Sequence, residues 1–94
     1  NLYQNYPNPF NPVTTIRYSI PTGVETLHAT SLRVYDILGK EVAVLVCEPQ
    51  TAGNYEVKFN SSHPEHGRSM ASGVYYYKLQ SGSFVQVKKL IIMK

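Results

Sequence analysis

Residues Gly73 to Met93 read GVYYYKLQSGSFVQVKKLIIM, two runs of apolar and aromatic residues with a period of two. A period of two places successive side chains on opposite faces of a β-strand. Between the two runs, Ser81-Gly82 supplies a glycine that can adopt the positive φ of a tight turn. The stretch therefore predicts a β-hairpin.

The same period recurs along most of the chain. Four more segments alternate in this way or form short aliphatic runs, and they cover residues 15–20, 31–35, 42–46 and 54–59. With a short strand at residues 2–4, the chain contains about seven strands, and no segment keeps helical spacing for ten residues. We therefore expect an all-β protein built as an antiparallel β-sandwich.

Length and composition indicate one domain, residues 1–94. The chain has 94 residues, of which 43% are hydrophobic, enough for a single compact core. A net charge of +3 is too small to indicate nucleic-acid binding, which needs a clustered basic face. The longest aliphatic run, Val42 to Cys47, is far shorter than a transmembrane segment. Because the chain starts abruptly at Asn1, we expect it to be a fragment of a longer protein.

Two local motifs predict how the strands are connected and covered. The segment Tyr6 to Pro12 holds three prolines, which remove amide donors and so exclude a central strand. We expect this segment to cross an edge of the sandwich with Phe10 in the core. Between two strands, Gly39 can take positive φ and the Asp36 carboxylate can accept loop amides.

Catalytic chemistry is not indicated. Asp36 is the only aspartate, and the glutamates are scattered without a facing pair of the kind a glycosidase needs. His63 and His66 flank Glu65, but their spacing matches no metal motif. Cys47, the only cysteine, excludes an intrachain disulfide. We therefore expect no catalytic residue, no cofactor and no metal.

Two features leave a choice between packing and recognition. The three adjacent tyrosines at 75–77 must point to both faces of one sheet, so one face packs in the core. The other face either packs against a neighbour or forms an aromatic platform for sugar or protein. Residues 88–94 hold three lysines among aliphatic residues, which suits either a plain terminal strand or a recognition tail.

In their order, five motifs resemble the type A C-terminal sorting domain of the type IX secretion system. They are YPNPFNPVTTIRYSIP (6–21), LRVYDILGKEV (32–42), AGNY (52–55), ASGVYYYKL (71–79) and KKLIIMK (88–94). The resemblance covers nearly the whole chain, and it implies an immunoglobulin-like β-sandwich. It also implies that the domain is a secretion signal rather than a catalyst.

The resemblance further implies a route and partners. Members of this family lie at the C-termini of exported proteins of Gram-negative bacteria, which cross the periplasm and are recognised by an outer-membrane translocon. In many of them a sortase-like peptidase cuts ahead of the domain and joins the cargo to the cell surface. We therefore expect a fused N-terminal cargo domain and a location at the cell surface or in the medium.

The same resemblance assigns roles to particular residues. Recognition falls on the first residues of one strand and on the lysines of the last: Gly73, Val74, Tyr75, Lys88, Lys89 and Lys94. Structural roles fall on the opening motif and on the turn: Pro7, Asn8, Pro9, Phe10, Asp36 and Gly39.

Two other functions stay open at this point. Residues 60–70 and the ASGVYYYKL strand also resemble the immunoglobulin-like domain of the flagellar hook-capping protein, which implies a structural or assembly spacer. A carbohydrate-binding sandwich that uses the tyrosines as a platform is a further alternative.

Cys47 departs from the sorting-domain pattern, because a polar turn residue is more usual there.

Overall fold

The structure of the protein is a computed structural model, which describes residues 1–20, 28–61 and 71–93. These residues form six strands and no helix, so the all-β prediction is confirmed. The strands are β1 (Val13–Ile20), β2 (His28–Tyr35), β3 (Glu41–Gln50), β4 (Gly53–Asn60), β5 (Gly73–Ser81) and β6 (Phe84–Ile92).

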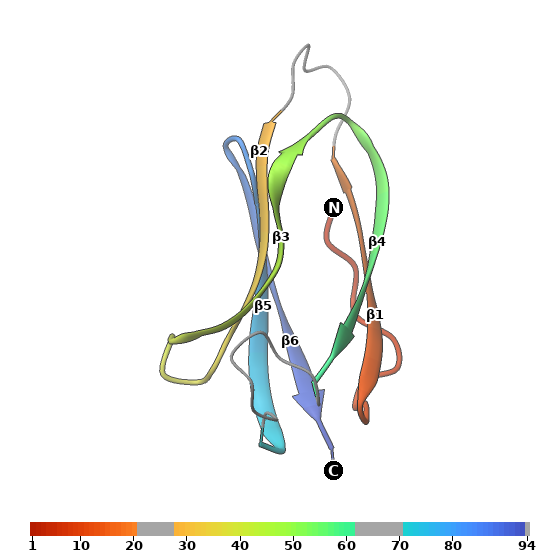
Figure 1. Ribbon diagram of the computed structural model, residues 1–94, viewed down its shortest axis with the longest axis vertical. Helices are drawn as coiled ribbons and strands as arrows, with labels where there is room; N and C mark the ends of the chain where they lie inside the picture. Colours follow the sequence, from red (N-terminus) through yellow and green to blue (C-terminus); the bar gives the residue numbers. More distant parts are fainter. Residues whose placement is uncertain (21–27, 62–70, 94) are drawn as a thin grey trace.

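The strands form two antiparallel sheets that face each other as layers of a sandwich (Figure 1). One sheet has the order β1-β4, and the other has the order β3-β2-β5-β6. We call these the two-stranded and the four-stranded sheet. The short connection between β3 and β4 carries the chain from one layer to the other. Register shifts at Leu32/Arg33 and Val34/Tyr35 mark irregular pairing between β2 and β3.

The core lies between the sheets and follows from the alternation seen in the sequence. On β5, Tyr77 and Leu79 are buried while Tyr76 and Gln80 point outward. Stacked rings of Tyr18 and Tyr55, with centroids 5.3 Å apart, fill the end of the core near the β3–β4 connection. The buried apolar side chains are Leu2, Phe10, Ile16, Tyr18, Ile20, Leu32, Val34, Ala43, Val46, Phe59, Tyr77, Leu79, Leu90 and Ile92.

The strand expected at residues 2–4 does not form. Leu2 makes only an isolated bridge to Tyr18 beside β1. The N–H of Asn5 donates to the hydroxyl of Tyr77, 2.8 Å away, instead of joining a ladder with β1. This segment therefore follows β1 without pairing regularly with it, and the count is six strands rather than about seven.

Residues 1–12, which we call the N-terminal strap, close one side of the sandwich. The N–H of Tyr3 donates to the carbonyl of Arg17 in β1 at 3.0 Å. Further along, the N–H of Phe10 donates to the carbonyl of Ile91 in β6 at 3.1 Å. The Phe10 ring is buried and meets Phe59 edge to face, with centroids 5.9 Å apart. The expectation that the proline-rich segment crosses an edge with Phe10 in the core is confirmed.

The turn between β2 and β3 also agrees with its motif. One carboxylate oxygen of Asp36 accepts the N–H groups of Leu38 and Lys40, each at 2.9 Å. Gly39 has φ +86°, a left-handed conformation that side chains rarely adopt. The hairpin therefore owes its tight turn to these two residues.

We expect Phe10→Ala to lower the free energy of unfolding by about 3 to 5 kcal/mol, because it leaves a cavity where the strap enters the core. Equilibrium urea unfolding measures the change. Leu38→Ala is the matched control, since Leu38 is 89% exposed and its loss should stay within about 0.5 kcal/mol. A loss below about 1 kcal/mol for Phe10→Ala would contradict a strap anchored in the core.

Candidate functional site

The β5–β6 hairpin brings most of the predicted recognition residues together. Gly73 at the start of β5 pairs with Ile92 near the end of β6, and Val74 pairs with Ile91. Lys89 lies opposite Tyr76, and Lys88 lies opposite Tyr77. The antiparallel pairing therefore joins two segments that are separate in the sequence motif.

The lysines at the end of the chain do not form one patch. Lys89 is exposed on the outer face of the four-stranded sheet, whereas Lys88 is half-buried on the face that looks toward the other sheet. This follows from the period of two, because adjacent strand residues point to opposite sides. Lys94 lies outside the described residues.

The tyrosine triplet is split between the two faces in the same way. Tyr77 is fully buried, and the hydroxyl of half-buried Tyr75 donates to the carbonyl of Ala71 at 2.9 Å. Only Tyr76 is exposed on the outer face, at 39% of its surface. These three residues therefore do not supply the row of exposed rings that a sugar-binding platform needs.

The outward side chains of the hairpin form a surface that is apolar and basic. We call it the hairpin face. Exposed valines lie next to lysine along it, and Val85 and Val87 expose 49% and 52% of their surface. Neither β5 nor β6 contains an acidic residue. The hairpin face consists of Val74, Tyr76, Lys78, Gln80, Val85, Val87, Lys89 and Ile91.

Val85 and Val87 were not among the residues singled out from the sequence, although a signal was present. Leu90 and Ile92 fill the core, and Val85 and Val87 have the opposite parity on the same strand. They therefore point to the outer face of the sheet, and they are exposed there unless a second layer of structure covers that face. The sequence pattern alone does not exclude such a layer.

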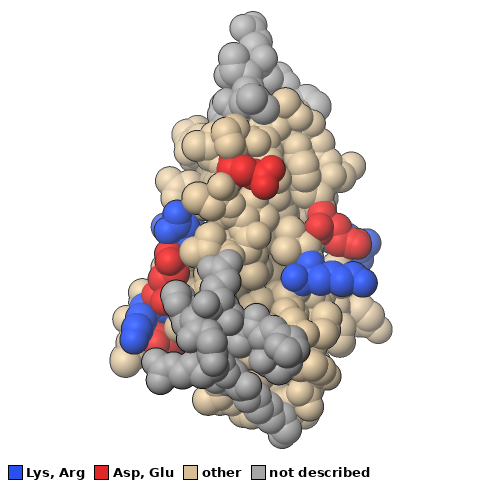
Figure 2. Space-filling model, in the orientation of Figure 1, with Lys and Arg blue, Asp and Glu red and all other residues tan. Residues whose placement is uncertain are grey.

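Charges on the side of the molecule seen in Figure 2 are mixed. Blue and red side chains lie next to each other on both flanks, and a separate red group lies near the upper middle of the view. Between β2 and β3, the Arg33 guanidinium donates to the Glu41 carboxylate at 2.8 Å, which raises the pKa of Arg33. The described part of this side therefore lacks the continuous basic face of a nucleic-acid-binding protein.

The inner side of the hairpin is tied to the strap by the Tyr77 hydroxyl. It donates to the carbonyl of Tyr3 at 2.7 Å and accepts the N–H of Asn5 at 2.8 Å. The Asn5 side chain donates in turn to the hydroxyl of Thr14 at 3.0 Å, and Thr14 donates to the carbonyl of Pro7 at 2.8 Å. Burial raises the pKa of Tyr77 to about 12, so the hydroxyl stays protonated.

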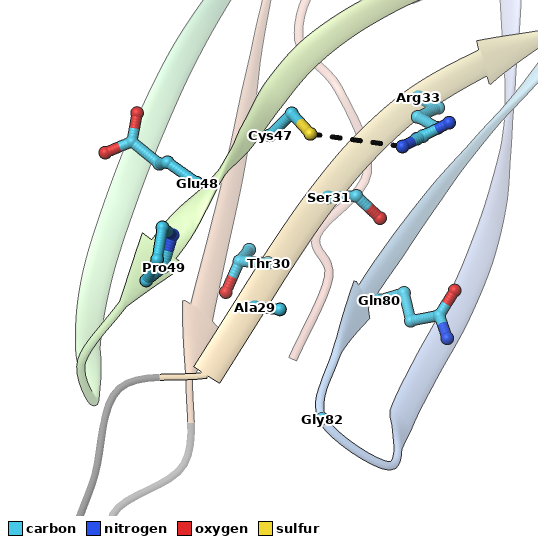
Figure 3. A pocket seen from close by; sticks show the side chains of 9 residues that line it. All are labelled: Ala29, Thr30, Ser31, Arg33, Cys47, Glu48, Pro49, Gln80 and Gly82. Carbon is cyan, nitrogen blue, oxygen red and sulfur yellow. Dashed lines mark hydrogen bonds between the residues drawn. The ribbon is translucent and has the colours of Figure 1, made fainter.

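An open hollow of about 430 Å³ lies on the outer face, where β2, β3 and the β5–β6 turn come together (Figure 3). Its polar side chains include Ser31, Gln80 and Arg33, and the Arg33 guanidinium lies 4.0 Å from the sulfur of Cys47. The carboxylate of Glu48 also lines the hollow. Cys47 is exposed in β3, two positions before Pro49.

Two further features are absent from residues 1–20, 28–61 and 71–93: a cluster of metal ligands and a membrane-spanning helix. No three histidine, cysteine or acidic side chains come close enough to hold a metal ion there. The His63, Glu65 and His66 group, like the rest of residues 62–70 with their hook-capping resemblance, lies outside the described residues. None of the described segments is a helix that could cross a bilayer.

The fold and this surface define a small β-sandwich whose conspicuous feature is the apolar and basic hairpin face. Residues 4–93 match the model of the family described as the secretion system C-terminal sorting domain. The chain belongs to this family. A search of curated proteins found no match.

One solved structure shares the fold. It is that of PorZ, described as an essential bacterial surface component of the type-IX secretion system of Porphyromonas gingivalis. The TM-score is 0.64 and the identity is 21%, and the match covers all of this chain but only 12% of that one. The chain thus corresponds to a small part of the length of PorZ.

Membership of this family gives the function of the domain. The protein is a C-terminal sorting signal for type IX secretion, which directs export to the cell surface or the medium. This agrees with the expectation drawn from the five sequence motifs. Catalysis is not the role of the family.

The buried Tyr77 hydroxyl should make the free energy of unfolding depend on pH in the alkaline range. The pKa is 10.0 for an ordinary tyrosine and about 12 for Tyr77 in the folded chain. Below pH 10 both states keep the proton, and its contribution to stability is complete. Above pH 10 the unfolded state ionises first, so stability falls by about 2 to 3 kcal/mol up to pH 12.

Urea unfolding at pH 9 and pH 11.5 tests this expectation. At pH 9, Tyr77→Phe should have a lower free energy of unfolding than the unmodified domain, because it leaves the Asn5 N–H without its acceptor. Between pH 9 and pH 11.5, the free energy of unfolding of this variant should fall by less. Tyr76→Phe is the control, since its ring is exposed and the full decline should remain. Equal declines in both variants would show that Tyr77 is not the titrating group.

Proposed function

We propose that the β5–β6 hairpin is the part of the domain that the outer-membrane translocon reads. The observation that carries this proposal is the hairpin face, where exposed valines and lysines lie together without an acidic residue. The same hairpin contains Gly73, Val74 and Tyr75, which the sorting-domain motif marks for recognition. A receptor with acidic and apolar groups would complement such a surface.

The rigidity of the hairpin supports this role. A translocon that exports many unrelated cargoes needs a surface whose shape does not depend on the cargo. The hairpin has an unbroken register of nine pairs, from Gly73–Ile92 to Ser81–Phe84. Its inner side is fixed by the buried Leu79, Leu90 and Ile92, so the outer face keeps one shape.

The domain, in this proposal, forms the C-terminal part of a longer exported protein. Residues 1–94 make one sandwich, and the cargo would precede Asn1, which is exposed at the start of the strap. The family resemblance supports passage through the periplasm and, in many members, a cut ahead of the domain by a sortase-like peptidase. The domain is then a substrate of the secretion machinery.

Export of a reporter tests the proposal. Residues 1–94, placed behind a signal peptide and an inert reporter, should carry the reporter to the cell surface or medium of a host with this secretion system. A translocon-deficient strain should hold it in the periplasm. Changing Lys88, Lys89 and Lys94 together to Glu should lower export at least tenfold, because the charge of the hairpin is reversed.

The matched control reverses three exposed basic residues away from the hairpin, namely Arg17, Lys40 and Lys58. It should be exported within twofold of the unmodified fusion. Because Lys88 is half-buried, circular dichroism and urea unfolding must show that both triple variants are folded. Normal export of the folded hairpin variant would refute recognition through these lysines.

A further inference from the structure

The outer edge of β6 is an unusual feature of the four-stranded sheet, because it is closed along only half of its length. β6 is the last strand in the order β3-β2-β5-β6. The N–H and C=O groups of its even-numbered residues face β5, so those of Val85, Val87, Lys89 and Ile91 point away from the sheet. Groups of this kind form a template for a further strand.

The strap occupies the second half of this edge. Ile91 donates its N–H to the side-chain oxygen of Asn8 at 2.9 Å, and its carbonyl accepts the N–H of Phe10 at 3.1 Å. Met93 donates to the carbonyl of Phe10 at 2.9 Å. Toward the start of β6, the last strap contact with its backbone is the side-chain amide of Gln4, which donates to the carbonyl of Lys89 at 2.7 Å.

The first half of the edge is open. Among the described residues, no hydrogen bond reaches the outward N–H or C=O of Val85 or Val87. The nearest strap contact is the N–H of Leu2, which donates to the side chain of Gln86 and not to the backbone of β6. With both valine side chains half exposed, a free edge and an apolar surface coincide over three residues.

The charge around this open edge selects the kind of partner. The hairpin contains Lys78, Lys88 and Lys89 and no acidic residue, and its charge of +3 equals the net charge of the whole chain. The charges of all other residues therefore cancel. In the register of the sheet, Lys78 lies opposite Val87, and Lys89 follows Val87 on the same face. A strand added here would place its side chains beside valines and lysines.

We infer that the open edge of β6, from Val85 to Lys89, binds an extended segment of the secretion receptor as an added β-strand. Alternate residues of this segment share the outer face, where apolar side chains meet Val85 and Val87 and an acidic side chain meets Lys89. This inference rests on the proposed function and adds the mode of recognition. A second copy of the chain fits less well, because two hairpins with only lysines would meet.

Strand addition has a further consequence for the strap. An added strand that follows β6 past Lys89 meets Asn8 and Phe10, which already occupy the edge. The strap therefore limits the added strand to the first half of β6 and sets its register. This limit explains why the same molecule combines a closed and an open half on one strand.

Val87→Pro tests the inference on the main chain. The N–H of Val87 points away from β5, so proline removes a donor that the added strand needs without breaking the ladder within the domain. In the reporter fusion, export should fall at least tenfold. Val87→Thr, which keeps the N–H and the branched side chain, should fall by no more than threefold.

A charge variant provides a second test, should the proline variant prove unfolded by circular dichroism. Lys89→Glu should lower export at least fivefold. Arg17→Glu makes the same change of charge on the outer face of the two-stranded sheet and should remain within twofold of the unmodified fusion. Undiminished export of folded Val87→Pro, or of Lys89→Glu, would overturn strand addition at this edge.

The controls separate this inference from the proposed function. If the unmodified fusion is not exported, the proposed function fails and the inference falls with it. If the unmodified fusion and folded Val87→Pro are exported equally, only the inference fails. Sedimentation of the purified domain measures whether the open edge pairs with a second copy of the chain. If the unmodified domain is a dimer at micromolar concentration and Val87→Pro is a monomer, the edge serves self-pairing and the receptor strand is refuted.

Discussion

The hydroxyl group of Tyr77 joins the first residues of the chain to its last hairpin. It contacts the backbone of Tyr3 and Asn5, more than 70 residues away in sequence, and both Tyr77 and Asn5 are buried. Any displacement of the strap would leave these polar groups buried without partners, which is costly in a core. Together with the backbone hydrogen bonds of the strap to β1 and β6, this side chain holds the strap against β1 and β5 and so closes one side of the sandwich.

The position of the strap then determines which surfaces of the domain remain free. Asn8 and Phe10 take the last part of the β6 edge, and the same segment follows β1 on the opposite sheet. The first residues of the strap bond to β1 instead, as the N–H of Tyr3 does to the carbonyl of Arg17, and they leave the first half of the β6 edge uncovered. A recognition surface on β5 and β6 is thus a consequence of how the chain begins as much as of how it ends.

Charge is distributed in keeping with this arrangement. Outside the β5–β6 hairpin the basic and acidic residues sum to zero charge, whereas the hairpin has three lysines and no acidic residue on its strands. Elsewhere, as at Arg33 and Glu41, charges of opposite sign meet across the sheet. The excess positive charge is therefore local, and a receptor can respond to it even though the net charge of the chain is small.

The sequence by itself determined the six long strands, the placement of Tyr76 and Tyr77 on opposite faces of one sheet, the buried Phe10 and the Asp36–Gly39 turn. These features depend on a period of two or on the chemistry of a few neighbouring residues, which the sequence displays directly. Only the tertiary structure decided that Leu2 makes a bridge rather than a strand and that half of the β6 edge is open. These features depend on contacts between residues 70 to 85 positions apart, such as Asn8 with Ile91. Local periodicity carries no information about such partners, because a strand looks the same in sequence whether its edge is covered or free.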